Sequence, residues 1–212
     1  MARWTRRDFL RKTAAAAAVV PVLGRARASL ASAGPRHVVV SRAVGPNEKV
    51  RVGLIGCGGM GRGDLATFFK YAEVDCPVIC DVDEAQLAKT IELVKEKRGY
   101  TPEAVKDFRR IIDRKDVDVC LVATPDHWHA LPTVYACEAG KDVYVEKPLA
   151  KTIEEGRAMV EAARRYSCVV QMGTQWRSAE HFREAVDVVH SGKLGKIRQV
   201  RCWAYLDWVG GI

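Results

Sequence analysis

A glycine-rich turn in this chain has the spacing of a phosphate-binding loop. Gly56, Gly58 and Gly61 form the pattern G-x-G-x-x-G, directly after the apolar run Val50–Ile55. In this pattern the first glycine permits a tight turn, the second lets a pyrophosphate approach the backbone, and the third lets the next helix pack closely. Free N–H groups at the start of that helix bind phosphate oxygens. The alternative is a glycine-rich turn that binds no ligand.

An acidic residue at the end of the next apolar run indicates which dinucleotide is bound. Asp81 follows Val78–Cys80 and lies 20 residues after Gly61. A carboxylate at this position accepts hydrogen bonds from ribose hydroxyls and repels a 2′-phosphate. Residues 82–84 include no Lys or Arg to neutralise such a phosphate, so NAD is favoured over NADP. Alternatively, Asp81 caps the following helix, which Asp83 would do equally well.

The elements that must position these residues alternate between strands and helices. Strands are expected at 50–55, 74–81, 104–107, 117–123, 143–146 and 168–172, and helices at 59–70, 83–97, 108–114, 125–138 and 152–166. This alternation predicts an α/β fold, a Rossmann-type doubly wound parallel sheet with helices on both faces. Ligands bind beyond the carboxyl ends of the strands in such sheets. Asp81, Thr124-Pro125 and Glu146–Pro148 all fall at these ends.

The first 33 residues have the features of a twin-arginine export signal. Arg6 and Arg7 are followed by Phe9 and Leu10, and then by the alanine-rich stretch Ala14–Leu23. That stretch is too short for a mature transmembrane helix, so no stable membrane anchor is expected. We therefore predict a signal peptide over 1–33, a linker over 34–48, a periplasmic protein, and the twin-arginine export machinery as a partner. A disordered basic tail on a cytoplasmic protein is the alternative.

The basic charge of the chain belongs to this leader. Residues 1–47 contain nine Lys or Arg and one Asp, whereas residues 48–212 contain 25 basic and 25 acidic residues. The body of the chain has no basic stripe interleaved with aromatic residues, which excludes a nucleic-acid partner. The seven cysteines are odd in number, and Cys76-x-x-x-Cys80 lacks the paired spacing of a zinc site. We expect them to be small buried hydrophobic residues.

Four segments together resemble the Gfo/Idh/MocA oxidoreductases, which are named after glucose–fructose oxidoreductase and inositol dehydrogenase. They are the glycine motif, Ala123–Ala130, Ala139–Pro148 and Gly173–Gln175. The resemblance covers about residues 48–208, and its most specific part is Glu146-Lys147-Pro148. It implies an NAD(P)-binding Rossmann domain over 49–172 and the start of a second α/β domain over 173–212.

The resemblance also implies roles for individual residues. Lys147 would be the catalytic lysine beside the nicotinamide, where its ammonium can stabilise a developing alkoxide. Glu146 would bind near the nicotinamide ribose, and Pro148 would follow a cis peptide. Pro125 and His129 would lie along the cofactor. The predicted cofactor-binding residues are Gly56, Gly58, Gly59, Met60, Gly61, Asp81, Thr124, Pro125, His129, Glu146, Lys147 and Gln175.

For other residues the sequence leaves more than one interpretation open. Trp128 either stacks on the cofactor or packs under its turn. His127-x-His129 has no third ligand nearby, so no metal is expected. Without the resemblance, Lys147 has two open interpretations, a catalytic lysine and an incidental surface lysine.

The expected activity is that of an NAD-dependent oxidoreductase acting on a sugar or cyclitol hydroxyl. One alternative is an NAD-dependent glycosidase that oxidises its sugar transiently, and another is a non-catalytic NAD-binding fragment. Relatives have a second domain that supplies a catalytic histidine and a dimerisation surface. Here only the helix 178–190 and one strand, 197–205, are expected from it, so activity and oligomerisation would be impaired by truncation.

The leader gives a direct test of export. Changing Arg6 and Arg7 together to Lys should trap the precursor in the cytoplasm, because the export signal requires the arginine pair. Fractionation of cells expressing each form measures this, with an Arg25→Lys variant as the control. Normal export of the double variant would contradict the assignment.

Overall fold

Six parallel strands form one sheet in the computed structural model, which describes residues 49–203. The strand order is β3-β2-β1-β4-β5-β6, and every neighbouring pair is parallel. The strands are β1 (Val50–Ile55), β2 (Val74–Cys80), β3 (Glu103–Val105), β4 (Val119–Val122), β5 (Asp142–Glu146) and β6 (Val170–Gly173). The order reverses between β1 and β4, which makes that point the ligand-binding crevice of a doubly wound sheet. The predicted α/β fold is confirmed.

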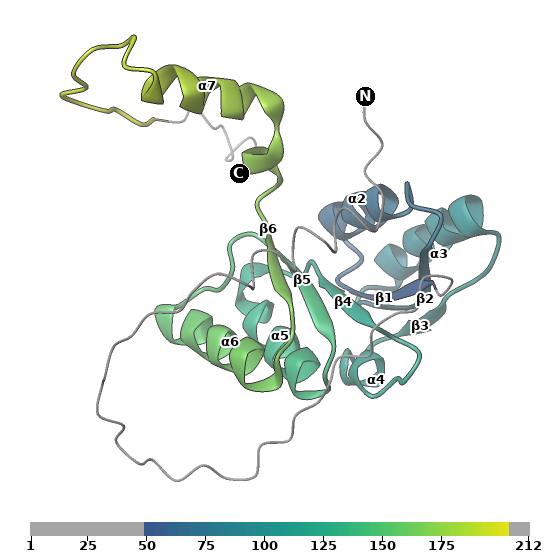
Figure 1. The fold of residues 1–212 in the computed structure, drawn as a ribbon. Helices are drawn as coiled ribbons and strands as arrows, with labels where there is room; N and C mark the ends of the chain where they lie inside the picture. Colours follow the sequence, from purple (N-terminus) through teal and green to yellow (C-terminus); the bar gives the residue numbers. More distant parts are fainter. Residues whose placement is uncertain (1–48, 204–212) are drawn as a thin grey trace, which may run out of the picture. The chain divides into compact units, whose positions relative to one another are not determined.

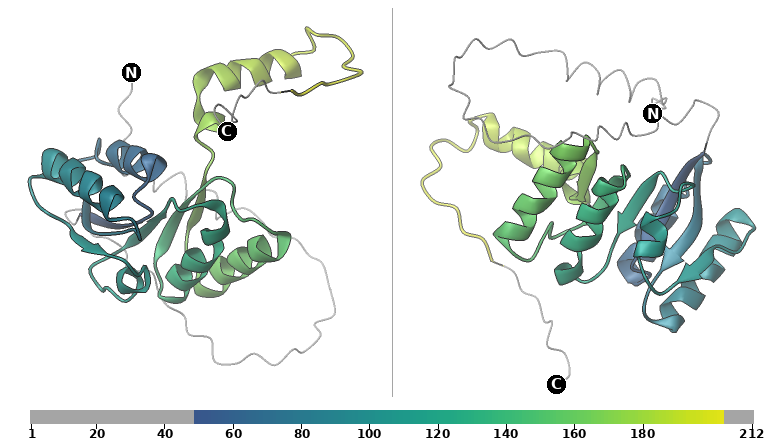
Figure 2. Two further views of the ribbon diagram at one scale, coloured as in Figure 1. Left: turned by 180° about the vertical axis from the view of Figure 1, so that it is seen from behind. Right: turned by 90° about the horizontal axis from the view of Figure 1, so that it is seen from below.

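Helices cover both faces of this sheet (Figures 1 and 2). They are α2 (Gly59–Phe68), α3 (Glu84–Arg98), α4 (Arg109–Ile112), α5 (Ala130–Glu138) and α6 (Ile153–Tyr166), with the short 3₁₀ turns η1 (Asp126–Trp128) and η2 (Gln175–Ser178). Helix α7 (Glu180–His190) follows η2 and buries none of its residues. None of the helices within residues 49–203 is long and apolar enough to cross a membrane.

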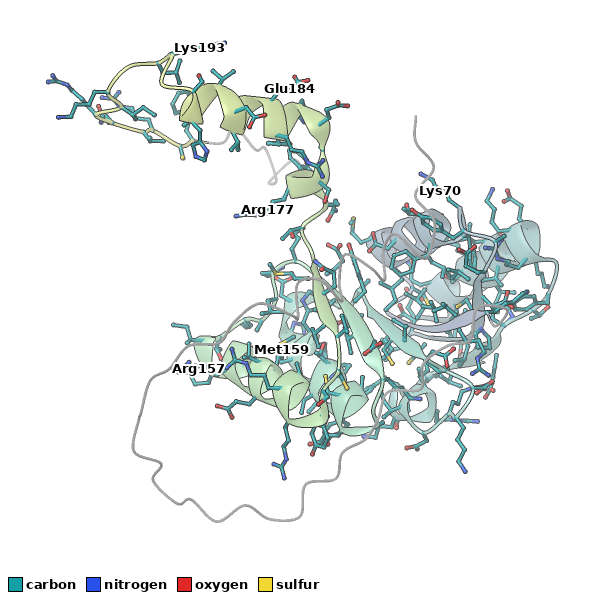
Figure 3. The ribbon with its side chains drawn as sticks, in the orientation of Figure 1. Lys70, Arg157, Met159, Arg177, Glu184 and Lys193 are labelled. Carbon is teal, nitrogen blue, oxygen red and sulfur yellow. The ribbon has the colours of Figure 1, made fainter. Side chains whose placement is uncertain are left out.

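The two faces of the sheet have separate apolar cores. Leu65 of α2 and Val94 of α3 pack with Leu54 of β1 on one face. Met159 of α6 is buried in the core of the other face, whereas Arg157 on the same helix is exposed (Figure 3). Because central strands contribute to both cores, they read as nearly continuous apolar runs in the sequence.

Two helices begin with the caps that the sequence indicates. The Asp83 carboxylate accepts a hydrogen bond from the Ala85 N–H and caps α3. Thr152 and Glu155 form the expected capping box of α6. The capping alternative for Asp81 is therefore wrong, since Asp83 performs that function.

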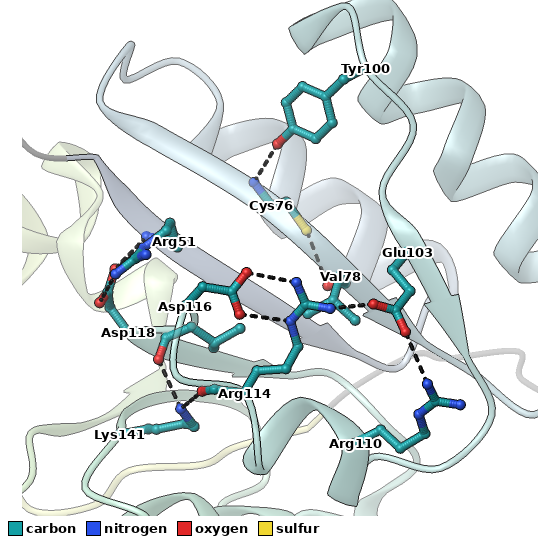
Figure 4. Close-up of polar contacts among 11 residues, drawn as sticks. Arg51, Cys76, Val78, Tyr100, Glu103, Arg110, Arg114, Asp116, Asp118 and Lys141 are labelled. Carbon is teal, nitrogen blue, oxygen red and sulfur yellow. Dashed lines mark hydrogen bonds and ion pairs between the residues drawn. The ribbon is translucent and has the colours of Figure 1, made fainter.

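A polar network ties the strands together at the end of the sheet opposite the crevice (Figure 4). The Arg51 guanidinium binds Asp118 through two N–H groups, at 3.1 and 3.0 Å, and links β1 to the start of β4. Lys141, only 6% exposed, donates to the backbone carbonyls of Arg114 and Val117. The Lys141 ammonium thereby supplies hydrogen-bond donors to two backbone carbonyl groups in the turn before β4.

Three expectations from the sequence need correction. The helix expected over 125–138 begins with a separate 3₁₀ turn, η1, before α5. The strand expected at 197–205 is absent over 197–203, the part that the structure describes, because a strand needs a neighbour for its backbone hydrogen bonds. Among the cysteines, which are all free, Cys202 is exposed and Cys168 is half-buried; the rest are buried as expected.

The Lys141 contacts give a test of the fold. Lys141→Met keeps the side-chain length but leaves two buried carbonyls without their donor, so it should lower the free energy of unfolding by about 1–3 kcal/mol. Urea unfolding measures this, with the exposed Lys115 changed to Met as the matched control. Equal stability of the two variants would show that water replaces the ammonium.

Candidate nucleotide-binding site

A cavity of about 970 Å³ opens at the carboxyl ends of β1, β2, β4 and β5. Its volume is at the upper end of the range for small-molecule sites. Three loops and two strand ends contribute its walls. Its lining residues include Gly56, Gly58, Gly59, Met60, Asp81, Asp83, Lys106, Asp107, Phe108, Arg109, Thr124, Pro125, Asp126, His127, Trp128, Glu146 and Lys147.

The glycine loop lies between β1 and α2 and has the geometry that a phosphate needs. Gly56 has φ +97°, and a Cβ there would lie 2.6 Å from the backbone of Ala123. A Cβ on Gly61 would overlap the carbonyl oxygen of Gly56, so α2 approaches the strand end only because that position is glycine. Gly58 and Gly59 face open space, which leaves their backbone accessible to a ligand.

Asp81 binds this loop as well as lining the cavity. One carboxylate oxygen accepts from the Cys57 N–H at 2.7 Å, and the other accepts from the Asp83 N–H at 2.9 Å. The charge is therefore held at the end of β2, beside the glycine turn. A carboxylate there can receive ribose hydroxyls on its remaining lone pairs.

The wall next to Asp81 contains basic groups that sequence reasoning missed. Lys106 and Arg109 follow β3 and line the same cavity. Lys106 pairs with Glu84 at 2.5 Å, and Arg109 pairs with Asp107 at 3.0 Å. The absence of Lys and Arg at residues 82–84 is therefore too narrow a criterion for predicting NAD rather than NADP. Both of these cations, however, already have carboxylate partners.

The turn after β4 forms the next wall. Thr124, Pro125 and His127 line the cavity, and Trp128 lines it while packing edge-on against Phe108, with ring centroids 6.4 Å apart. Both alternatives for Trp128 are thus compatible with its position. Another shallow hollow, bordered by His127 and Lys151, adjoins this turn.

His129 lies behind the wall rather than in it. Its ring is 1% exposed, with Nδ1 2.6 Å from the Pro148 carbonyl oxygen and Nε2 2.8 Å from that of Thr124. The ring therefore joins the turn after β4 to the segment after β5. A neutral imidazole has one N–H and can donate to only one of these carbonyls.

The last wall is the end of β5. Glu146 is 3% exposed and Lys147 is exposed, and both line the cavity. The Lys147–Pro148 peptide bond is cis, as the resemblance implies. The exposed Lys147 side chain is accessible to a molecule bound in the cavity.

The Glu146 carboxylate acts electrostatically on a second acidic side chain, Asp64 of α2. Asp64 of α2 and Glu146 each have one buried oxygen without a hydrogen-bond partner, as does the Thr124 hydroxyl. Burial, together with the Glu146 carboxylate, raises the pKa of Asp64 to about 6. Sequence reasoning did not select Asp64, because only the fold brings it within electrostatic range of Glu146.

Three of the predicted cofactor-binding residues are not in the cavity wall. Gly61 is buried under the loop, His129 is behind the turn after β4, and Gln175 is exposed on η2. The structure brings the other nine together. Within residues 49–203, no three His, Cys, Asp or Glu side chains are grouped to hold a metal ion.

The cavity fits a dinucleotide in size and chemistry. Open backbone at Gly58 and Gly59 suits a pyrophosphate, and Asp81 suits a ribose. The part of the cavity at Thr124, Glu146 and Lys147 remains for the other nucleotide. Fold and site together therefore define a dinucleotide-binding protein.

Comparison with known families agrees with this class. The sequence profile described as "Oxidoreductase family, NAD-binding Rossmann fold" matches residues 50–174. The chain belongs to this family, the Gfo/Idh/MocA oxidoreductases.

Individual relatives extend the comparison. The chain is 30% identical over 204 residues to "Glycosyl hydrolase family 109 protein 1" from Shewanella sp. (strain ANA-3), covering 91% of this chain and 44% of the relative. It is 31% identical over 157 residues to "Alpha-N-acetylgalactosaminidase" from Shewanella oneidensis, covering 71% and 34%. The crystal structure of myo-inositol 2-dehydrogenase from Lactobacillus plantarum superposes with a TM-score of 0.61 at 27% identity, covering 71% and 43%. The chain thus spans less than half the length of these relatives.

Asp81 gives a test of cofactor choice. Asp81→Asn removes the charge but keeps an acceptor for the loop, so the preference for NAD over NADP should narrow by roughly five- to tenfold, about 1 kcal/mol of lost repulsion. Fluorescence titration with both cofactors measures this. Asp126→Asn, on another wall, should leave the preference unchanged; a preference that does not narrow in Asp81→Asn would refute the role.

The half-buried carboxyl group of Asp64 gives a pH test. Its pKa is raised to about 6 in the folded protein, so its favourable contribution is complete below about pH 4 and is lost as the pH rises through 6. Asp64→Asn should therefore stabilise the protein at pH 8 by about 1 kcal/mol, a value reduced for solvent screening, and should have no effect near pH 4. Thermal unfolding across this range measures it; a constant difference at all pH values would contradict the burial argument.

Proposed function

We propose that the protein is an NAD-dependent glycosidase that oxidises its sugar transiently. One observation supports this over a net dehydrogenase. The curated relatives at 30% and 31% identity are named as a glycosyl hydrolase of family 109 and an α-N-acetylgalactosaminidase. The substrate class would be a glycoside of an amino sugar.

The place of each residue in the cavity determines its proposed role. The glycine loop and Asp81 bind the dinucleotide and fix its register along the cavity. When bound, the nicotinamide would accept a hydride from the sugar carbon and later return it, so that no net oxidation remains. The Lys147 ammonium would donate a hydrogen bond to the sugar hydroxyl oxygen as that oxygen transfers its proton to water, which stabilises the developing negative charge.

A second candidate is a net dehydrogenase of a sugar or cyclitol hydroxyl. The likeness to myo-inositol 2-dehydrogenase, at 27% identity and a TM-score of 0.61, favours it. The same Lys147 position serves both reactions, because both begin by removing a hydride and a hydroxyl proton. They differ in whether reduced cofactor accumulates.

The choice of cofactor and the location follow from the sequence. NAD is preferred to NADP in this proposal, because Asp81 places a negative charge where a 2′-phosphate would bind. The protein acts in the periplasm after export in the folded state, because residues 1–33 resemble a twin-arginine signal. That leader lies outside the described residues.

One assay distinguishes the two activities. Incubation with NAD and a chromogenic α-N-acetylgalactosaminide should release chromophore without accumulation of NADH, and release should need NAD. Lys147→Met should lower the rate by roughly 10²- to 10⁴-fold, whereas the exposed Lys97→Met should not. NADH formed in proportion to consumed free inositol or sugar, without chromophore release, would favour the dehydrogenase and contradict the glycosidase.

A further inference from the structure

A buried histidine ring bridges the two cavity walls nearest Lys147. The His129 side chain is almost fully enclosed, and its Nδ1 lies 2.6 Å from the carbonyl oxygen of Pro148. Its Nε2 lies 2.8 Å from the carbonyl oxygen of Thr124. Pro148 directly follows Lys147, and both Thr124 and Lys147 line the cavity. One rigid ring therefore spans the gap between the turn after β4 and the segment after β5.

The ring is itself held at a fixed place. His129 immediately precedes α5, and its N–H donates to the Asp126 carbonyl at 3.3 Å. Its own carbonyl accepts from the hydroxyl of the fully buried Thr133 at 2.8 Å. Because the backbone is tied to the start of a helix and the ring is enclosed, the two ring nitrogens have little freedom to move.

The position of Lys147 depends on the backbone on either side of it. Its N–H donates to the Glu146 carboxylate at 3.2 Å. The carbonyl of the next residue, Pro148, faces the His129 ring. The Lys147 side chain is exposed, so close packing does not fix its ammonium. The hydrogen bonds of this short backbone segment therefore determine where the ammonium can reach.

We propose that His129 is a positioning residue for Lys147, which it holds at a set distance from the turn after β4 through the Pro148 carbonyl. The inference rests on the proposed function, in which the Lys147 ammonium contacts the reacting hydroxyl. His129 does not line the cavity, so it acts through the backbone and touches neither cofactor nor sugar. A displacement of about 1 Å in a reacting group costs on the order of a hundredfold in rate.

Three substitutions separate the two contacts of the ring. In His129→Asn the amide nitrogen takes the place of Nδ1 and keeps a donor for Pro148, whereas in His129→Gln it takes the place of Nε2 and keeps a donor for Thr124. His129→Leu removes both donors. Because Pro148 adjoins Lys147, turnover should fall by roughly ten- to a hundredfold in His129→Leu and His129→Gln, and by less than about fivefold in His129→Asn. NAD⁺ affinity should change by less than about threefold in all three variants, since the glycine loop and Asp81 are untouched.

Lys141→Met is the matched control for a loss of stability alone. It also removes a buried donor from two backbone carbonyls, but at the opposite end of the sheet. It should lower the unfolding temperature, as His129→Leu does, and leave both turnover and NAD⁺ affinity unchanged. If His129→Leu does not fold, the comparison of His129→Asn with His129→Gln carries the test.

Hydrogen–deuterium exchange gives a readout that does not need turnover. Amides of residues 147–151 should exchange faster in His129→Leu than in the unchanged protein, because local opening of this segment becomes easier. Lys141→Met should leave exchange in this segment unchanged under conditions where the protein stays folded. Exchange in α3, on the other side of the cavity, should be the same in all these proteins.

The outcomes separate the inference from the function on which it rests. Equal loss of turnover in His129→Leu and Lys141→Met would give His129 a structural role only and overturn the inference. Recovery in His129→Gln but not in His129→Asn would assign the effect to the Thr124 wall and overturn it as well. If the unchanged protein binds NAD⁺ but releases no chromophore, the proposed glycosidase is wrong. The exchange of residues 147–151 then still decides whether His129 holds this segment, and unchanged exchange in His129→Leu would overturn the inference.

Discussion

The close approach of α2 to the end of β1 is the constraint on which the site depends. The helix can lie there only because Gly56 adopts a left-handed turn and Gly61 has no side chain to meet the Gly56 carbonyl. Asp81 then fixes the turn by accepting the Cys57 N–H. This packing directs the open backbone of Gly58 toward the cavity. The same helix carries Asp64, whose pKa is raised by burial and by the Glu146 carboxylate.

The far end of the sheet contributes rigidity rather than chemistry. The Arg51–Asp118 pair and the buried Lys141 ammonium connect β1, β4 and β5 at the ends away from the cavity. At the cavity end, His129 joins the segments after β4 and β5. A cavity wall built from strand ends and turns keeps its shape because both ends of those strands are held.

Much of this arrangement could be predicted from local patterns. Helical spacing, the Asp83 and Thr152 caps and the glycine motif are properties of short segments, and the structure has them where they were expected. The position of His129 behind the wall could not be predicted, because its ring bridges two segments that are far apart in the sequence. Lys106, Arg109 and Asp64 were missed because they belong to elements outside the motifs, and only the fold brings those elements near the motifs. The strand expected near Ile197 shows the converse, because an apolar run becomes a strand only when a neighbour pairs with it.

Binding of NAD⁺ to the glycine loop is the central claim, and Gly58 allows a sharp measurement. The structure leaves open space at this position, so Gly58→Asp should fold normally while placing a negative charge where a pyrophosphate would lie. Calorimetric titration with NAD⁺ should show one site per chain in the unchanged protein and at least a tenfold weaker one in Gly58→Asp, about 1.4 kcal/mol, with the same unfolding temperature. Equal binding by the two proteins would place the dinucleotide elsewhere and contradict the account.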